Sequence, residues 1–404
     1  SIRINDQSAD ESLLNYDHPE VLIYKKSTLV DRLTYDALMA TAVQTTTAPT
    51  RAAPQKSLML NQPDETLPVV SDARWSSALT HNSLAAFAVW VVFLLLLQVI
   101  GAPIAALLLD RFGDLGWGLA RLVTLVIAGY LVWIGASIRL ISFTAIWSWV
   151  AMAIVAGVAF AAAKRTAFET RLRRRRSVAL GAELTFWLVF GVFIVFRWAN
   201  PDSWHPIWGG EKPMEFAHFN AILRSAHFPP YDPWFAGGYI NYYYYGEYLV
   251  AFCMKLTGIP SEIAFNLAQP TLIALLASGA YSVAATLGRG RFDRYGSRLA
   301  GWLGALLMVG IGNLATLVHV AKVGVTHIHS NFVDWTWAPS RAIAGGITEF
   351  PFFTGLYADL HAHVVAWPLT VLVIAICYAL AADARLIVAA GTESSFRWSA
   401  RWLL

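Results

Sequence analysis

Residues 208–252 read WGGEKPMEFAHFNAILRSAHFPPYDPWFAGGYINYYYYGEYLVAF, and they lie between two basic runs, at 164–176 and 289–298. This stretch holds too many polar side chains to cross a bilayer and too many aromatic ones to stay free in water. Tyr and Trp rings are favoured at the level of the lipid headgroups. We therefore expect the stretch to rest on a membrane surface and to build a site there.

The rest of the chain has the composition of an integral membrane protein. Hydrophobic residues make up 57% of it and charged residues 14%, and the mean hydropathy is +0.50, values far from those of soluble domains. A helix needs about 20 apolar residues to span the hydrocarbon core. The alternating pattern of barrel strands is missing, so we predict an all-α, polytopic transmembrane helical bundle with long outer loops bearing juxtamembrane helices. About seven stretches qualify as spans: 82–109, 117–141, 143–163, 178–198, 261–287, 299–322 and 361–382.

Charges in the connections predict the orientation of the chain. Residues 164–176 hold seven Lys or Arg and one Glu, and residues 289–298 hold four Arg and one Asp. Residues 199–260 hold three basic and five acidic residues, and residues 323–360 hold one and three. Because Lys and Arg collect in cytoplasmic loops, we expect the two basic connections in the cytoplasm and the two aromatic loops outside it.

This orientation implies that segment 239–257 does not cross the membrane. Helix 178–198 leaves the cytoplasm and helix 261–287 must return to it, so the chain between them stays on the outer side. We expect a juxtamembrane or re-entrant helix with Tyr242 to Tyr245 at headgroup depth. The alternative is a complete span with an ordinary aromatic belt, which would place the second basic run outside.

The first 81 residues differ in kind from the rest. Residues 16–26 predict a turn and a short strand, and residues 28–42 predict a partly amphipathic helix. A linker rich in Thr, Ala and Pro follows, and we expect it to be flexible. The chain opens without a signal peptide and stops shortly after a helix, so we expect a fragment of a longer protein.

Three stretches resemble the YYY family of prokaryotic membrane proteins, whose function is unassigned. The first is residues 209–252, from GGEKPMEFAHFNAILRS through GGYINYYYYGEYLVAF. The second is residues 347–369, ITEFPFFTGLYADLHAHVVAWPL, and the third and weaker one is residues 110–141, DRFGDLGWGLARLVTLVIAGYLVWIGASIRLI. The chain has Arg121 where the family usually has Lys, and its tyrosine run is extended to four. The resemblance implies the cell membrane of a prokaryote. YDHPEVLIYKK is similar to the close of an extracytoplasmic domain in related proteins, which would make residues 1–81 the tail of an upstream unit.

The YYY family in turn resembles the GT-C superfamily of membrane glycosyltransferases, which transfer sugars from polyprenyl-phosphate donors at the outer face of the membrane. Residues 178–292 follow the GT-C order of a helix, a long acidic outer loop, a surface helix rich in Tyr and a returning helix. The resemblance implies a three-helix transmembrane lead-in at 82–163 and a GT-C-like transmembrane core at 164–404. A likeness of fold does not by itself establish activity.

Both outer loops offer residues that such a transfer needs. A carboxylate must deprotonate the acceptor or acidic residues must hold a metal, and cations must neutralise the departing phosphate. Glu211 and Glu215 share a face if residues 211–225 are helical, and with Asp359 they are the candidate catalytic residues. The alternative for the glutamates is a solvated surface helix, and for the tyrosines it is membrane anchoring. The candidate substrate-binding residues are Lys212, Asp232, Trp234, Tyr243, Tyr244, Arg341, Glu349 and His361.

Asp359, His361 and His363 read D-L-H-A-H at the mouth of a span, and they are candidate ligands of a divalent metal ion. On a regular helix the two imidazoles would lie about 200° apart, so they could hold one ion only from an unwound segment. The alternative is a capped helix start, with Asp359 as the N-cap and the imidazoles in solvent.

Two functions from different classes follow. The first is a membrane glycosyltransferase-like enzyme with a polyprenyl-phosphate sugar donor and an extracytoplasmic site. The second is a non-catalytic membrane scaffold or an accessory subunit of a larger complex, whose aromatic loops dock a protein, a lipid or a pigment.

A transporter could use Glu183, which lies within a span, but the sequence shows no inverted repeat. The run Arg173 to Arg176 suits anionic lipid and is too short to indicate nucleic acid.

Overall fold

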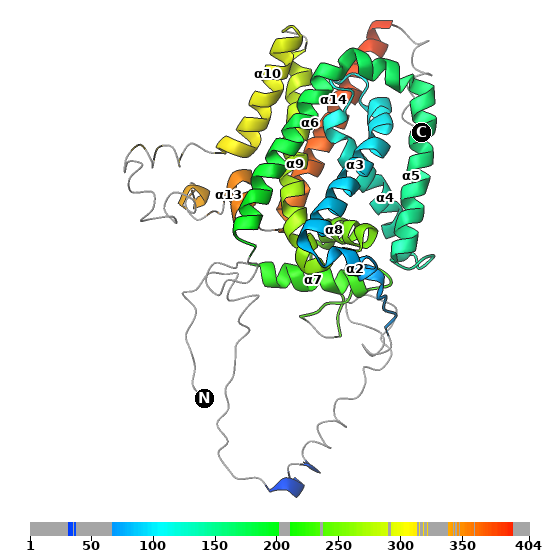
Figure 1. Cartoon of the computed structure of the whole chain (residues 1–404), viewed down its shortest axis with the longest axis vertical. Coiled ribbons are helices and arrows are strands. Elements are labelled where there is room, and N and C mark those ends of the chain that lie inside the picture. Colours follow the sequence, from blue (N-terminus) through cyan, green and yellow to red (C-terminus); the bar gives the residue numbers. More distant parts are fainter. Residues whose placement is uncertain are drawn as a thin grey trace.

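In the computed structural model the described residues form a bundle of α-helices (Figure 1). The structure describes residues 31–34, 36–37, 67–201, 211–234, 237–289, 292–312, 315, 318, 321, 338–341, 343, 346, 348–358 and 360–390. The predicted strand at 16–26 lies outside these ranges, and the described part of 28–42 is helical except at Asp31. The predicted all-α class is confirmed. The longer elements are α3 (Ser83–Leu108), α4 (Ala120–Ser137), α5 (Ala145–Thr166), α6 (Phe168–Ala199), α7 (Lys212–Arg224), α8 (Tyr244–Thr257), α9 (Ser261–Gly288), α10 (Arg294–Ala305) and α14 (Ala362–Ala390).

Six helices in the described ranges are long and apolar enough to cross a membrane: α3, the helix Trp117–Ser137 that contains α4, α5, α6, α9 and the first part of α14. The seventh predicted span, 299–322, coincides in part with α10 and the π-helical turn Leu306–Ile311 that follows it. Together these two elements reach about 27 Å at ~1.5 Å per residue. Most of the remaining residues of that predicted span lie outside the described ranges.

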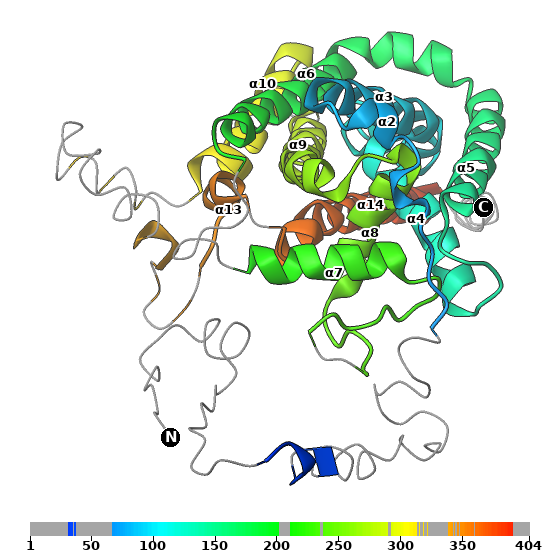
Figure 2. The same cartoon turned by 60° about the horizontal axis from the view of Figure 1, so that its bottom comes forward.

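Helices α6 and α9 run antiparallel, and this fixes where the connections lie. Near the end of α6, Arg197 Nε donates a hydrogen bond of 2.9 Å to Asn266 Oδ1, near the start of α9. At the opposite end, a Cβ added to Gly181 of α6 would meet the ring of Tyr281 on α9. The connection through α7 and α8 therefore leaves and re-enters the bundle at the same end, and Figures 1 and 2 both show α7 lying across that end.

Helix α8 does not cross the bundle. Its 14 residues reach about 21 Å, less than the ~30 Å of a hydrocarbon core. Every residue from Glu247 to Thr257 is buried, so the helix is enclosed by protein. It ends at Gly258, whose φ of 68° places it in the left-handed region, where glycine is favoured. A Cβ there would also meet the backbone nitrogen of Ser76 at 2.7 Å.

The residues before α3 are fastened to α8. Lys255 is fully buried and forms a salt bridge with Asp72. The Trp75 indole donates a hydrogen bond of 2.9 Å to the Lys255 carbonyl, and Ser76 Oγ donates one of 2.8 Å to the Thr257 carbonyl. The final part of the Thr-, Ala- and Pro-rich segment is thus packed against the bundle from Leu67 onward, because it carries these anchoring side chains.

Among the described residues, one charged pair lies inside the predicted spans. Arg121 is 2% exposed and forms a salt bridge with Glu183, which also accepts hydrogen bonds from the indoles of Trp117 and Trp187. The Arg121 guanidinium also lies 3.9 Å from the Phe186 ring centroid. Each charge is therefore paired and hydrogen-bonded, as buried charges must be. This arrangement joins α4 to α6 and accounts for Glu183 without a transport pathway.

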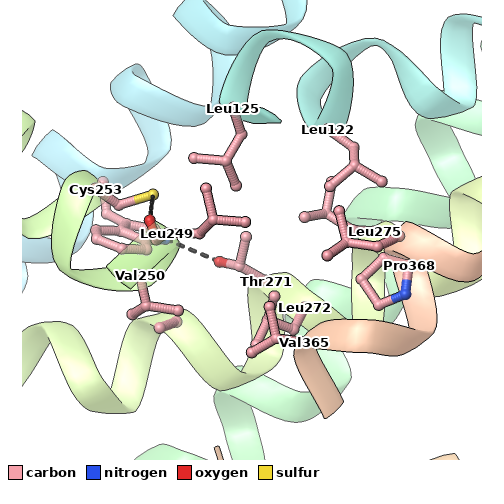
Figure 3. Close-up of a pocket in the computed structure, with 13 residues that line it drawn as sticks. Leu122, Leu125, Leu249, Val250, Cys253, Thr271, Leu272, Leu275, Val365 and Pro368 are labelled. Carbon is pink, nitrogen blue, oxygen red and sulfur yellow. Dashed lines mark hydrogen bonds between the residues drawn. The ribbon is translucent and has the colours of Figure 1, made fainter. Parts of the chain in front are cut away.

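The centre of the bundle is closely packed. Figure 3 shows the mostly apolar side chains that line a void between α3, α4, α8, α9 and α14. The volume of this void is about 20 Å³. Its two polar groups are satisfied within the protein, since Thr271 accepts from the Trp90 indole and Cys253 donates to the Leu249 carbonyl. A space of this size holds at most a water molecule, so this void is too small for a larger ligand.

Candidate active site

Carboxylates and an imidazole from two distant segments converge at the end of the bundle occupied by α7. Glu211 precedes the first residue of α7, and Glu215 lies one turn later on the same face, as their spacing of four residues requires. His361 directly precedes α14. One ligand atom from each of Glu211, Glu215 and His361 lies within 4.8 Å of the others. We call these three residues the Glu-Glu-His cluster.

His361 is the centre of the contacts. Its Nε2 forms a salt bridge with Glu211 and shares a hydrogen bond with the hydroxyl of Tyr242, which lies two residues before α8. Its Nδ1 lies 3.1 Å from Nδ1 of His363. The imidazole of His361 therefore joins the start of α7, the tyrosine run and the start of α14.

His363 and Glu349 extend the cluster on the side of the second loop. His363 Nε2 lies 3.1 Å from Glu349 Oε2, and Glu349 also accepts a hydrogen bond of 3.0 Å from Thr354 Oγ1. Burial alone would raise the pKa of the Glu349 carboxyl, but the hydrogen bond and charge of His363 hold that pKa below its ordinary value. Glu349 and His363 therefore lie in contact at the edge of the cluster.

Glu215 and Glu247 are the two most deeply buried carboxylates here. Glu215 is 0% exposed, and its Oε2 accepts a hydrogen bond of 3.2 Å from the backbone nitrogen of Leu360. Glu247 of α8 is 1% exposed, and its Oε1 lies 3.3 Å from Nδ1 of His218 on α7. The His218 ring in turn lies 5.8 Å from that of Tyr242. Glu247 and His218 therefore form a second layer behind the cluster.

An aromatic groove borders the cluster. It lies between α4, α8 and α14 and has a volume of about 790 Å³. Its lining is Tyr130, Trp133, Tyr242, Tyr243, Tyr244, Tyr245, Gly246, Ala362, His363, Val365, Ala366 and Leu369. Tyr242 and His363 belong both to this wall and to the contacts of His361. The groove is thus apolar along most of its length and polar where it meets the cluster.

The tyrosines of the groove are held by packing. The Trp133 indole donates a hydrogen bond of 3.3 Å to the Tyr244 hydroxyl, and the Trp133 ring lies edge-on to Tyr245. Burial raises the pKa of Tyr244, and burial together with Tyr130 raises that of Tyr245 to about 12. These phenols therefore stay neutral and present aromatic surface and hydroxyl groups.

Of the predicted site residues, the structure brings Glu211, Glu215, Glu349, His361 and His363 into one connected group, with Tyr243 and Tyr244 in the adjoining groove. Lys212 is 8% exposed at the first position of α7. Asp359 lies outside the described residues.

Three predicted residues take other places. Asp232 Oδ1 accepts a hydrogen bond of 2.8 Å from the backbone nitrogen of Trp234, and the Trp234 side chain is 53% exposed. Arg341 donates a hydrogen bond of 2.8 Å to Ser340 Oγ. None of these contacts reaches the Glu-Glu-His cluster.

Sequence reasoning missed Tyr242, His218 and Trp133 as members of the site. Tyr242 belongs to the tyrosine run, in which the sequence does not distinguish the ring that contacts His361. His218 lies three residues after Glu215, which places both near one face of a helix, and this spacing could have revealed it. Trp133 lies in a predicted span, where an aromatic residue is ordinary.

Comparison with known proteins identifies the family. Residues 127–387 match the model of an uncharacterized membrane protein family, DUF2298, and the chain belongs to that family. The match contains the whole Glu-Glu-His cluster and the aromatic groove. Neither the search of curated proteins nor the search of solved structures found a match.

Proposed function

We propose that this membrane protein is a glycosyltransferase of the GT-C type, which transfers a sugar from a polyprenyl-phosphate donor at the extracytoplasmic face. The observation that supports it best is the meeting of the Glu-Glu-His cluster with the aromatic groove. Such a donor has a polar head, the sugar phosphate, and a hydrocarbon chain. The cluster would face the head, and the apolar groove would hold the chain.

The sidedness in this proposal rests on the distribution of charge. The basic runs at 164–176 and 289–298 favour the cytoplasm by the positive-inside rule. The cluster lies at the other end of α6 and α9, so it would face the outside. The bilayer is the proposed partner along the outer surface of the spans, where many apolar side chains are exposed.

The groove would receive the hydrocarbon chain of the donor. Its wall is made of aromatic rings, Val365 and Leu369, with the small residues Gly246, Ala362 and Ala366 between them. Small side chains leave room along the wall for an inserted chain. The phosphate and sugar would then lie at the end where Tyr242 and His363 border the groove.

The reaction requires one proton transfer and one displacement. The hydroxyl of the acceptor would give its proton to the carboxylate of Glu349, which accepts a hydrogen bond from Thr354 and contacts His363. The oxygen would attack the anomeric carbon of the sugar and form the new bond. The bond from that carbon to the phosphate oxygen would break, and polyprenyl phosphate would leave with the electron pair. Glu211 and Glu215 would act on the phosphate side of the centre, beside the buried Lys212.

The test is turnover by the full chain in proteoliposomes supplied with a set of radiolabelled polyprenyl-phosphate monosaccharides. We expect sugar release or transfer from at least one donor, and a loss of at least ~100-fold in Glu211→Gln and in Glu349→Gln. The matched control is Glu169→Gln, an exposed glutamate at the opposite end of α6. Full activity in both site variants would overturn the assignment. If no donor is consumed and the protein purifies with a bound partner, the scaffold or accessory-subunit alternative is supported instead.

A further inference from the structure

We infer that Glu211, Glu215 and His361 bind one divalent transition-metal ion. This inference deepens the proposed function, and it rests on the proposal that the cluster is the active centre. The ligand set differs from the one that the D-L-H-A-H motif predicts, because it takes only His361 from that motif and both carboxylates from α7.

The geometry of the cluster suits a metal ion. The three ligand atoms lie within 4.8 Å of one another. A tetrahedral Zn²⁺ ion with bonds of about 2.1 Å holds its ligands ~3.4 Å apart. His361 Nε2 and Glu211 are in direct contact, so an ion would enter between them as these two atoms move apart. The spacing of four residues on α7 directs both carboxylates to the same point.

The charge around the cluster also calls for a cation. Glu215 and Glu247 are almost completely buried, and Glu211 and Glu349 are about one-fifth exposed. Carboxylates brought this close together repel one another. A divalent ion would replace part of that repulsion by attraction to a shared centre.

A second layer of contacts holds the ligands in place. Metal-binding imidazoles usually have a partner on the nitrogen that does not bind the metal. His361 directs Nε2 toward Glu211, while its Nδ1 lies 3.1 Å from His363. His363 is in turn held by Glu349, and Glu215 by the backbone nitrogen of Leu360. These contacts orient both sides of the proposed site before any ion arrives.

The donor atoms favour Zn²⁺ or Mn²⁺ over Mg²⁺ or Ca²⁺. An imidazole suits transition metals, and the carboxylates add hard oxygen donors. Three protein ligands leave at least one coordination position open, as in catalytic metal sites. In the proposed reaction, a phosphate oxygen of the lipid donor would take that position, which explains how two carboxylates can face an anionic group.

The test is metal binding by the full chain in detergent, with no sugar donor present. Purified protein is treated with a chelator, dialysed, and titrated separately with Zn²⁺ and Mn²⁺; bound metal is measured by mass spectrometry and, for Mn²⁺, by electron paramagnetic resonance. We expect about one ion per chain, with affinity at least ~100-fold lower in Glu211→Gln and His361→Gln. The matched control is Glu262→Gln, a half-exposed glutamate that pairs with Arg74 near the same end of the bundle.

Wild-type stoichiometry and affinity in both ligand variants would overturn the inference, and so would a wild-type protein that binds neither ion. Glu211→Gln alters a partly exposed side chain, so it provides a folded variant even if substitution elsewhere in the cluster disrupts the protein. Metal binding without sugar transfer would support this inference and count against the proposed function. Sugar transfer by chelated, metal-free protein would support the proposed function and count against this inference.

Discussion

The hydroxyl of Tyr242 and Nε2 of His361 share a hydrogen bond, although the two residues are 119 positions apart in the chain. This contact ties the beginning of α8 to the beginning of α14. It also connects the aromatic groove to the Glu-Glu-His cluster, because Tyr242 belongs to the wall of the groove.

Replacing Tyr242 by Phe should strengthen metal binding by roughly 2- to 10-fold, because the hydroxyl occupies Nε2 of His361, the nitrogen that would bind the ion, and this hydrogen bond must be given up. The ring and its packing remain, so the melting temperature should change little. Titration with Zn²⁺ measures the effect. Tyr243→Phe is the matched control, because Tyr243 is 75% exposed. Equal affinities in the two variants would show that the hydroxyl of Tyr242 does not compete with the ion for Nε2 of His361.

Filling the groove should block the lipid donor without touching the cluster. Ala366→Trp places a bulky ring in the wall of the groove, and we expect donor turnover to fall at least ~10-fold while metal binding is retained. The control is Val373→Trp, which adds a similar ring to an exposed position of the same helix. Turnover that is equally high in Ala366→Trp would exclude the groove as the place of the hydrocarbon chain.

Glu349 should contribute to the stability of the protein in a pH-dependent way. Its pKa in the folded protein is lower than the ordinary value of 4.5, so its contribution is present above that value and is lost as the pH falls through the folded-state pKa. The melting temperature of the wild type should therefore drop more than that of Glu349→Gln as the pH is lowered from 7 to about 3. Equal drops, measured by differential scanning fluorimetry, would contradict this assignment.

The salt bridge between Asp72 and Lys255 should show strong coupling between its partners. Asp72→Asn leaves a fully buried ammonium group without its counter-charge, and the expected loss is about 3 kcal/mol. Lys255→Met combined with Asp72→Asn should lose less than Asp72→Asn alone, because the uncompensated charge is gone. A double-mutant cycle on unfolding free energies measures the coupling, and simple additivity of the two changes would show that the pair is not coupled.

Much of the architecture could be predicted from the sequence because bilayers impose simple rules. Apolar length predicts the spans, and the basic runs predict that α6 and α9 have opposite directions, which excludes a complete crossing by α8. The spacing of Glu211 and Glu215 predicts a common helical face. Each of these arguments depends on residues that are close in the chain or on the uniform chemistry of the membrane.

The contacts between distant segments could not be predicted in the same way. Arg121 pairs with Glu183, Lys255 with Asp72, and Glu247 with His218, and each pair depends on how helices rotate and pack against each other. Hydrophobic periodicity carries little of that information when a helix is apolar on every side. The catalytic role of the cluster, its metal and its donor stay predictions until the measurements above are made.

The fastening of residues 72–76 to α8 has a mechanical consequence. Helix α8 begins within the tyrosine run and ends at the residues that hold Trp75 and Ser76. Residues 72–76 are also tied to α5 and α9, because Asp72 accepts a hydrogen bond from the backbone nitrogen of Ala145 and Arg74 pairs with Glu262. The segment therefore stiffens this end of the bundle, including the helix whose first residues form the wall of the groove.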